Sequence, residues 1–465
     1  MDFYLRWGKF RYSYRECEKM STLQFGTGRS VIDPPVKMGL AGYFNTRIWE
    51  KVHDSLEVRV VILVQENLTA LCVQFELITV TPELFAKVRE KAAKHLDNPV
   101  ILSGATHCHT APELRKGRGG YDESYADFAA EMFEKALLQA KAALAPCTYM
   151  ASGRGANFEL GFNRRFWMRD GKVVTNPPKC SPDAVRPEGE IDPEIPLLLL
   201  ENTHGKVLFA SICNHADTTG GNDVSGDWPA RCAHEVEKVL GNDSMCMPLI
   251  GASGNINHFD LNDPDPQASF AEAARIGSGY AASIIEALDK MDEAAAWPLR
   301  AVCVPIHIGS RELFPEELAE AQEILAKYPP EDTANSSKAL TAQDFALKTP
   351  KVLRYFAENL LKVASEKRQF DFEITLISIG GVLLAGVPCE PFVEIGLELR
   401  KEIFAGCREV LVSVMNNGSG SGYIPNLWNY QRGGYENTPR SNPYSIHFAS
   451  ELKAACRDLK KTLEI

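Results

Sequence analysis

The sequence has few of the features that mark several common classes of protein. It has no CxxC pair among its 12 cysteines, no internal repeat and no low-complexity tract. Its longest uncharged run, 374–389, is too short to cross a membrane as a helix, and Gly380-Gly381 lies in its middle. We therefore predict two buried strands around a tight turn there, and no transmembrane segment.

Positive charge is also in deficit. The formal net charge is −11, which disfavours nucleic acid or an anionic membrane as the main partner. The first twenty residues are charged throughout and have no apolar segment typical of a secretory signal. We expect a cytoplasmic protein with reduced thiols.

The order of the chain predicts the fold class. Apolar content of 45% and charged content of 24% are those of a globular protein with a large core. Strand and helix patterns alternate to the end, for example two strands over 56–80 and a helix that begins at Pro82 after Thr81. We predict an α/β fold, layered, with mixed β-sheets flanked by helices. We expect 1–22 to be an N-terminal extension, with Met20 as an alternative start, and 23–465 to be a single domain.

Two other segments stand apart from this alternation. The stretch 176–196 is rich in proline and acidic residues and is predicted to be a long ordered loop. The stretch 328–344 lies between helices and is predicted to be an excursion rather than a domain boundary. Helix is expected again over 339–367.

Polar side chains follow several predicted strands. In "GATHCHTAPE", His107 and His109 come directly after an apolar run, and the period of a strand would place them on one face. His215 follows a second strand, Glu390 a third, and Tyr423 and Tyr435 a fourth. Ligands of open α/β sheets gather outside the carboxyl ends of strands. Each of these side chains alone also fits a structural role, and that alternative remains open.

Together these residue types suit a metal ion. Two neutral imidazoles, a carboxylate and a phenolate could make a closed N2O2 shell for Zn²⁺, or an open one with water as a further ligand, and the phenolate is the least usual member. Zinc would lower the pKa of a bound water and polarise a carbonyl group. Cys108 and Cys213 each precede a histidine and are predicted to be packing residues.

At this point the motifs resemble a known family. In order, they are "GTGRSVIDPP", "AGYFNTR", "GATHCHTAP", "GFNRR", "ICNHADTT…SGDWP", "GVPCEPFVEIGLELR" and "GYIPNLWNYQRGGYE". This series resembles the catalytic domain of neutral, or non-lysosomal, ceramidases, which are zinc-dependent amidases that cleave an N-acyl sphingosine. The resemblance extends from about Phe25 to the C-terminus.

The resemblance implies a set of site residues. The implied zinc ligands are His107, His215, Glu390 and Tyr423. The implied catalytic residues are His109, for proton transfer to the leaving group, and Arg164 and Tyr435, which would contact the reacting carbonyl and its developing oxyanion. Arg165 takes the place of Arg164 if the alignment is off by one residue.

The sequence also departs from the family. Asn257 stands where the family has a serine that matters for activity, and an amide cannot be a nucleophile, so hydrolysis by metal-activated water is favoured over a covalent route. His258 stands where the family has proline, and either reaches the site or caps the following turn. Phe166, Trp167 and Arg169 either line a pocket for a polar group or pack. The family's C-terminal β-domain is expected to be absent.

The sequence therefore predicts a zinc-dependent hydrolase that cleaves the amide bond of a small N-acyl compound, either ceramide or a soluble amide. Two alternatives remain open: a metal-dependent enzyme that acts on a carbohydrate or ester, and a non-catalytic descendant that binds a metal or ligand. The (β/α)8 amidohydrolases also carry HxH on a strand, but there it lies on the first barrel strand. Here two strands and a helix precede it, which disfavours that fold.

Overall fold

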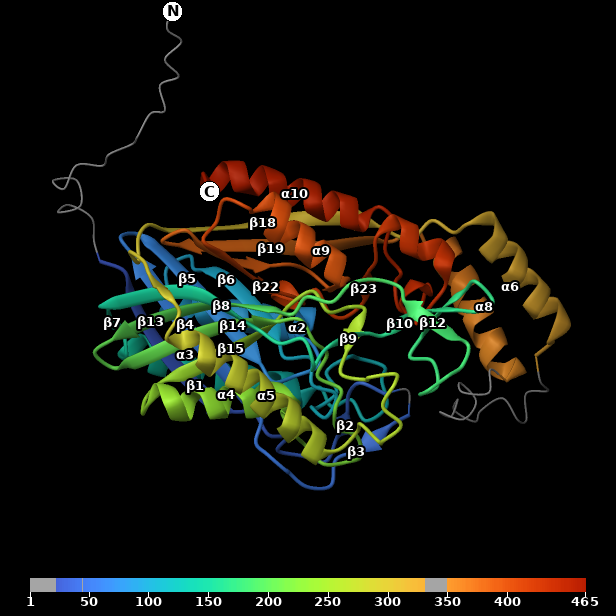
Figure 1. Cartoon of the computed structure of the whole chain (residues 1–465), viewed down its shortest axis with the longest axis horizontal. Helices are drawn as coiled ribbons and strands as arrows, with labels where there is room; N and C mark the ends of the chain where they lie inside the picture. The colour runs from blue at the N-terminus through green and yellow to red at the C-terminus, as the bar shows by residue number, and fades with distance from the viewer. Residues whose placement is uncertain (1–21, 44, 331–348) are drawn as a thin grey trace, which may run out of the picture.

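The computed structural model describes residues 22–43, 45–330 and 349–465, and three β-sheets dominate it (Figure 1). The first sheet contains β1 (Gln24–Val31), β4 (Glu57–Gln65), β5 (Leu68–Phe75), β6 (Val100–Ala105) and β7 (Ala145–Pro146). The second contains β8 (Tyr149–Ala156), β13 (Glu194–Asn202), β14 (Gly205–Ile212), β15 (Met245–Ile250) and β17 (Asp292–Glu293). The third contains β18 (Leu299–Gly309), β19 (Gln369–Ile379), β20 (Val382–Gly386) and β22 (Glu409–Ser413).

All three sheets follow one plan. The strand orders are β6-β5-β4-β1-β7, β15-β14-β13-β8-β17 and β22-β20-β19-β18. In each sheet three antiparallel strands are followed by a helix, and the next strand pairs in parallel with the third. The first, third and fourth strands of each unit therefore end at the same edge of their sheet. We expected no internal repeat from the residues, and the repetition of three units is one of topology.

A helix also follows the fourth strand of each unit, so that two helices belong to each sheet. The helices are α2 (Pro82–His95), α3 (Ser124–Ala142), α4 (Asp227–Leu240), α5 (Phe270–Leu288), α9 (Val393–Glu398), which continues into a π-helical segment (Leu399–Ile403), and α10 (Phe448–Leu463). Thr81 caps α2, because its hydroxyl oxygen accepts a hydrogen bond from the backbone of Leu84 at 3.3 Å.

Each unit carries an insertion between its first and second strands. The insertions contain β2 (Gly39–Leu40) and β3 (Arg47–Ile48); β9 (Phe162–Asn163), β10 (Arg165–Met168), β11 (Val173–Thr175) and β12 (Ala184–Pro187); and α6 (Pro315–Lys327) and α8 (Pro350–Ser365). Three further two-residue strands lie in loops after the main strands: β16 (Ile256–Asn257), β21 (Glu390–Pro391) and β23 (Tyr423–Ile424). Insertions and loops thus gather at the edges where the first, third and fourth strands end.

The three sheets share one apolar core. A cluster of buried side chains joins Val61 and Leu63 of the first sheet, Phe209 of the second, and Ile377 and Leu384 of the third. Burial of so much apolar surface, at about 25 cal/mol per Å², holds the sheets in a fixed relation to each other. The loops at the sheet edges are therefore carried on a rigid base.

The predicted fold class is confirmed, as are the hairpin at Gly380-Gly381 and the helix after Thr81. The prediction of a loop over 176–196 was wrong in part, because β12 and the start of β13 lie within it. The described part of the predicted helix over 339–367 is helical from Pro350 to Ser365. The N-terminal extension and Met20 fall on residues outside the described part, as does most of 328–344. No helix of the described residues is long and apolar enough to pass through a bilayer.

Candidate metal centre

The predicted ligands all lie on loops that follow the third or fourth strand of a unit. His107 and His109 follow β6, His215 follows β14, Glu390 follows β20 and Tyr423 follows β22. These loops leave the edges at which the parallel strands of the three units end. The fold therefore brings together side chains that are up to about three hundred residues apart in the chain.

The backbone at His107 differs from the prediction. We expected a strand to place His107 and His109 on one face, but β6 ends at Ala105 and His107 has a φ of 61°. This left-handed conformation is uncommon outside glycine and is held here by the surrounding structure. The two imidazoles nevertheless lie close together, with ring centroids 5.0 Å apart. Their proximity was expected, but it does not come from the period of a strand.

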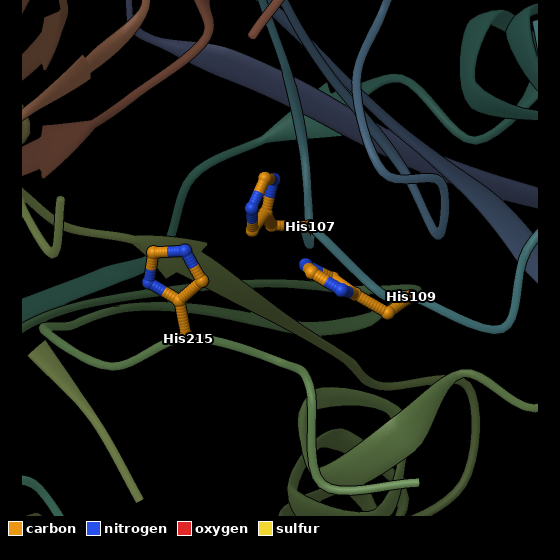
Figure 2. Close-up of side chains that lie close together, drawn as sticks. All are labelled: His107, His109 and His215. Atoms are coloured by element: carbon orange, nitrogen blue, oxygen red, sulfur yellow. The ribbon is translucent and has the colours of Figure 1, made fainter. Parts of the chain in front are cut away.

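Three imidazoles converge in this region (Figure 2). The ring centroids of His107 and His215 are 4.7 Å apart, and one nitrogen of each of His107, His109 and His215 lies within 4.8 Å of the others. His109 Nε2 is buried, and among the described residues it neither donates nor accepts a hydrogen bond. The three rings could therefore hold a metal ion together.

Hydrogen bonds define the protonation of two of these rings. His107 Nδ1 lies 2.7 Å from the carbonyl oxygen of Ile78, and His215 Nδ1 lies 2.9 Å from that of Ser253. A carbonyl oxygen only accepts, so each Nδ1 must donate, and in a neutral ring each Nε2 then carries a lone pair. Second-layer bonds of this kind orient histidines that bind metals.

The two lone pairs face a carboxylate. Glu390 Oε2 lies 3.3 Å from His107 Nε2 and 3.4 Å from His215 Nε2, and it accepts no hydrogen bond among the described residues. The other oxygen, Oε1, accepts a bond from the backbone N–H of Gly422 at 3.2 Å. Three buried acceptors that face each other repel unless a cation lies between them, so the donor set fits a divalent metal.

The charge states point the same way. Burial lowers the pKa of His107 to about 4, against the opposing effect of Glu390, so the ring is neutral. Burial would raise the pKa of Glu390, but the nearby histidines and Arg164 outweigh it and hold that pKa well below its usual range. Neutral imidazoles and an ionised carboxylate are the forms that bind a metal.

Tyr423 lies beside this cluster. Residues Glu390 and Tyr423 pair directly in the two-residue strands β21 and β23, and the rings of Tyr423 and His215 are 6.5 Å apart. Burial and the charge of Glu390 raise the pKa of Tyr423 far above its usual value, against the effect of Arg164. Without a metal Tyr423 is a neutral phenol, so its place as fourth ligand stays a prediction.

The structure distinguishes between the two neighbouring arginines. Arg164 Nη1 lies 3.5 Å from His215 Nε2, while its Nε donates to Glu436 at 2.9 Å and its Nη2 to the carbonyl of Gly254 at 2.7 Å. Arg165 instead pairs with Glu188 and Glu436 away from the histidines. Arg164 is thus the arginine at the site, with one nitrogen directed towards it.

Tyr435 occupies the rim of the same region. Its ring lies 6.0 Å from that of Tyr423, and 38% of the residue is exposed. Its backbone N–H donates to the hydroxyl of Thr175 at 3.0 Å, which ties the rim to the insertion of the second unit.

Sequence reasoning missed Asp217. This carboxylate follows His215 by two residues, and its Oδ1 lies 3.2 Å from Nδ1 of the fully buried His258. Burial alone would raise the pKa of Asp217, but the hydrogen bond from His258 and the surrounding histidines hold it far below its usual value. Its position just after a strand, like that of the other site residues, was the signal that could have revealed it.

The position at which the resemblance places the family's serine holds a buried amide. Asn257 is buried; its Nδ2 donates to Asn176 Oδ1 at 3.0 Å and its Oδ1 accepts from the backbone of Phe259 at 3.2 Å. His258 lies 3.2 Å from Asp217 and 2.7 Å from the carbonyl oxygen of Gln267, so its contact with the site region is through Asp217.

The remaining predictions concern packing. Cys108 and Cys213 are buried, as expected of packing residues. Trp167 is half-buried, with Arg432 5.4 Å and Arg186 5.7 Å from its ring. Arg169 is exposed and lies 3.7 Å from Asp183. This aromatic and its arginines form a surface stack rather than the wall of the histidine cluster.

No family model matches this sequence, and no curated protein matches it either. Solved structures do match. The neutral ceramidase of Pseudomonas aeruginosa aligns with a TM-score of 0.70 at 17% identity, over 95% of this chain and 75% of that one. The chain has the fold of a neutral ceramidase. A ceramidase solved in complex with C2 aligns with a TM-score of 0.69, also at 17% identity, over 95% of this chain and 76% of that one. The predicted resemblance is thus confirmed at the level of the fold.

Proposed function

We propose that this chain is a zinc-dependent amidohydrolase that cleaves an N-acyl compound by means of metal-activated water. The observation that carries this proposal is the meeting of two imidazole lone pairs with one oxygen of Glu390, at 3.3 and 3.4 Å. The shared fold with a neutral ceramidase supports amide hydrolysis as the reaction class. His107, His215 and Glu390 would hold the ion, with Tyr423 as the fourth ligand.

A bound zinc ion would lower the pKa of a water molecule and polarise a carbonyl group. The chain's own residues supply the rest. Arg164 Nη1 donates a hydrogen bond to the carbonyl oxygen as negative charge develops on it, and Glu436 and the carbonyl of Gly254 hold the guanidinium in place. Tyr435 closes the rim and donates from its hydroxyl to the same oxygen.

His109 is proposed to transfer a proton to the leaving nitrogen. Its Nε2 has no described hydrogen-bond partner, and burial, with the neighbouring His107, lowers its pKa well below the usual value. A neutral ring can accept a proton from the attacking water and return it to the amine. Because His109 also belongs to the group of three converging rings, it is a second candidate for a metal ligand.

The substrate is proposed to be a small N-acyl compound, either ceramide or a soluble amide. We propose the cytoplasm as the location, where the protein's cysteines would be reduced thiols. A soluble amide suits that compartment at least as well as a membrane lipid does.

Two measurements test the proposal. Protein purified without added metal should contain about one equivalent of zinc per chain, and chelation should abolish activity. A screen of acyl amides, acyl esters and oligosaccharides should release a free amine from the amides. Less than about a tenth of an equivalent of any transition metal, or cleavage of esters or glycosides alone, would overturn it.

The variant His109→Ala separates the two roles of that residue. If His109 transfers protons, the variant should keep its zinc and lose activity. Loss of zinc would instead make His109 a ligand and leave the proton transfer to another group.

A further inference from the structure

The carboxylate of Asp217 is held in an unusual way. His258 Nε2 lies 2.7 Å from the carbonyl oxygen of Gln267, and Nδ1 lies 3.2 Å from Asp217 Oδ1. The carbonyl requires a proton on Nε2, and an ionised Asp217 requires one on Nδ1, so the ring is a cation paired with the carboxylate. The His258 side chain is 0% exposed, while that of Asp217 is 16% exposed. The pair therefore has a buried end and an open end.

The second oxygen of Asp217 faces the open end. No described residue donates a hydrogen bond to Oδ2, and the atom is not among the buried atoms that lack a partner. It is thus an accessible, charged acceptor. A carboxylate oxygen in such a position is well suited to accept a hydrogen bond from a bound molecule.

The carboxylate of Asp217 lies near the candidate site. The backbone N–H of His109 donates to the carbonyl of Ala216 at 3.1 Å, which joins the two loops next to Asp217. The charge of Asp217 acts on His109 and on Tyr43, whose ring meets that of His109 at 5.8 Å. Arg164, by contrast, contacts His215 and lies against Tyr423. The site therefore has a donor beside Tyr423 and an acceptor beside His109.

We propose that Asp217, held by His258, determines specificity by accepting a hydrogen bond from a hydroxyl group on the amine half of the substrate. The inference rests on the proposed function, in which Arg164 binds the carbonyl oxygen and His109 lies at the leaving nitrogen. The amine half then lies beside Asp217. An N-acyl amino alcohol fits this acceptor, and an N-alkyl amide leaves a charged oxygen without a partner.

A matched pair of substrates tests this directly. N-Hexanoyl-2-aminoethanol and N-hexanoyl-propylamine differ only in a hydroxyl against a methyl group. The wild-type protein should favour the hydroxylated amide in kcat/KM by about ten- to a hundredfold. Asp217→Asn should lose most of this preference, and Asp217→Ala should lose all of it. In both variants kcat/KM should fall for the hydroxylated amide and stay the same for the alkyl amide.

Controls separate specificity from structure. Asp183→Asn removes an exposed carboxylate that pairs with Arg169. This variant should leave kcat/KM unchanged for both amides. His258→Gln keeps one donor to Asp217 without its charge and should lose part of the preference. Zinc content is measured for every variant, because Asp217 lies two residues from His215. The inference would be overturned if kcat/KM fell equally for both amides in Asp217→Asn, or if the wild type showed no preference between them.

A binding measurement keeps this test independent of catalysis. Affinities of both amides are measured by ligand-observed NMR in wild type and Asp217→Ala. If neither amide is cleaved but only the wild type binds the hydroxylated one more tightly, the hydrolase proposal falls and the role of Asp217 stands. If both amides are cleaved and bound equally well, the hydrolase proposal stands and the role of Asp217 falls.

Discussion

Two buried clusters of charged and polar groups in this protein occupy similar positions in the sequence but differ in their balance of charge. The first surrounds Arg59 on β4, whose guanidinium pairs with Glu76 and lies 2.8 Å from Glu57. The second is the group of His107, His215 and Glu390. Glu76 directly follows β5, the third strand of its unit, just as Glu390 follows β20. Position after a strand is therefore common to both.

The difference is the balance of charge. In the Arg59 cluster a cation already lies among the carboxylates, and both Arg59 and Glu76 have fully buried side chains. In the histidine cluster three acceptors face each other, and Arg164 Nη1 lies 3.5 Å from one of them, His215 Nε2. A buried cluster in which opposite charges already meet fits a structural role, and one that would need an added cation fits our proposal of a metal site.

The largest expected effect comes from removing a ligand. His215→Ala should lose zinc and reduce kcat/KM by more than about a thousandfold, because the ion that activates water is no longer held. His204→Ala, which truncates an exposed histidine in the turn between β13 and β14, is the control and should keep both its zinc and its activity. Elemental analysis and amine release measure the two effects. Full zinc content in His215→Ala would contradict the ligand assignment.

The next effect is on stability and separates the two clusters. Glu76→Gln should lower the free energy of unfolding by about 1–3 kcal/mol, because a neutral amide replaces one of the carboxylates around the buried Arg59, which keeps its pair with Glu57. In zinc-free protein, Glu390→Gln should change the free energy of unfolding only slightly. The new amide N–H can donate a hydrogen bond to the lone pair of His107 or His215. Denaturant unfolding of both variants with zinc removed measures this. Equal losses would mean that the histidine cluster is also a structural ion pair.

The same comparison shows how much of the fold and of the candidate site could be predicted from the sequence. The periodicity of apolar residues predicted the α/β class. The polar residues after strands made His107, His215 and Glu390 candidates, and the family resemblance implied their role as ligands. Nothing local predicted the left-handed backbone at His107, because its stability depends on packing between units. The threefold plan of the sheets was also missed, since topology repeats here without repetition of residues.

Asp217 and Glu436 show a second limit. Both are acidic residues in polar loops, and sequence alone treats them as ordinary surface charges. Their roles come from partners far along the chain: His258 for Asp217, and Arg164 with Arg165 for Glu436. Charge balance between distant loops is set by tertiary structure, which spacing in one sequence does not encode.

The two neighbouring arginines allow a finer comparison of the same kind. Arg164→Lys keeps a positive charge beside Glu436 but loses the forked donor, so kcat should fall by about a hundredfold with zinc retained. Arg165→Lys weakens pairs with Glu188 and Glu436 and should act mainly on the unfolding free energy. Steady-state kinetics and thermal unfolding of both variants distinguish these outcomes. The reverse pattern would move the oxyanion donor to Arg165.

The smallest predicted effect tests whether the histidine cluster depends on its packing as well as its ligands. Gly42 has a φ of 96°, and a Cβ atom there would lie 2.6 Å from Cγ of His109. Gly42→Ala should therefore push the His109 ring aside and lower kcat by about tenfold, while His107 and His215 keep zinc in place.

Gly171 supplies the matched control for this variant. Its φ is 81°, yet a Cβ atom there would meet nothing within 4 Å, so Gly171→Ala imposes similar backbone strain without any contact with the site. Both variants should lose about 1 kcal/mol of stability from that strain, and only Gly42→Ala should lose activity. If the two variants lose activity equally, strain rather than the position of His109 accounts for the effect, and His109 need not be held by Gly42 at all.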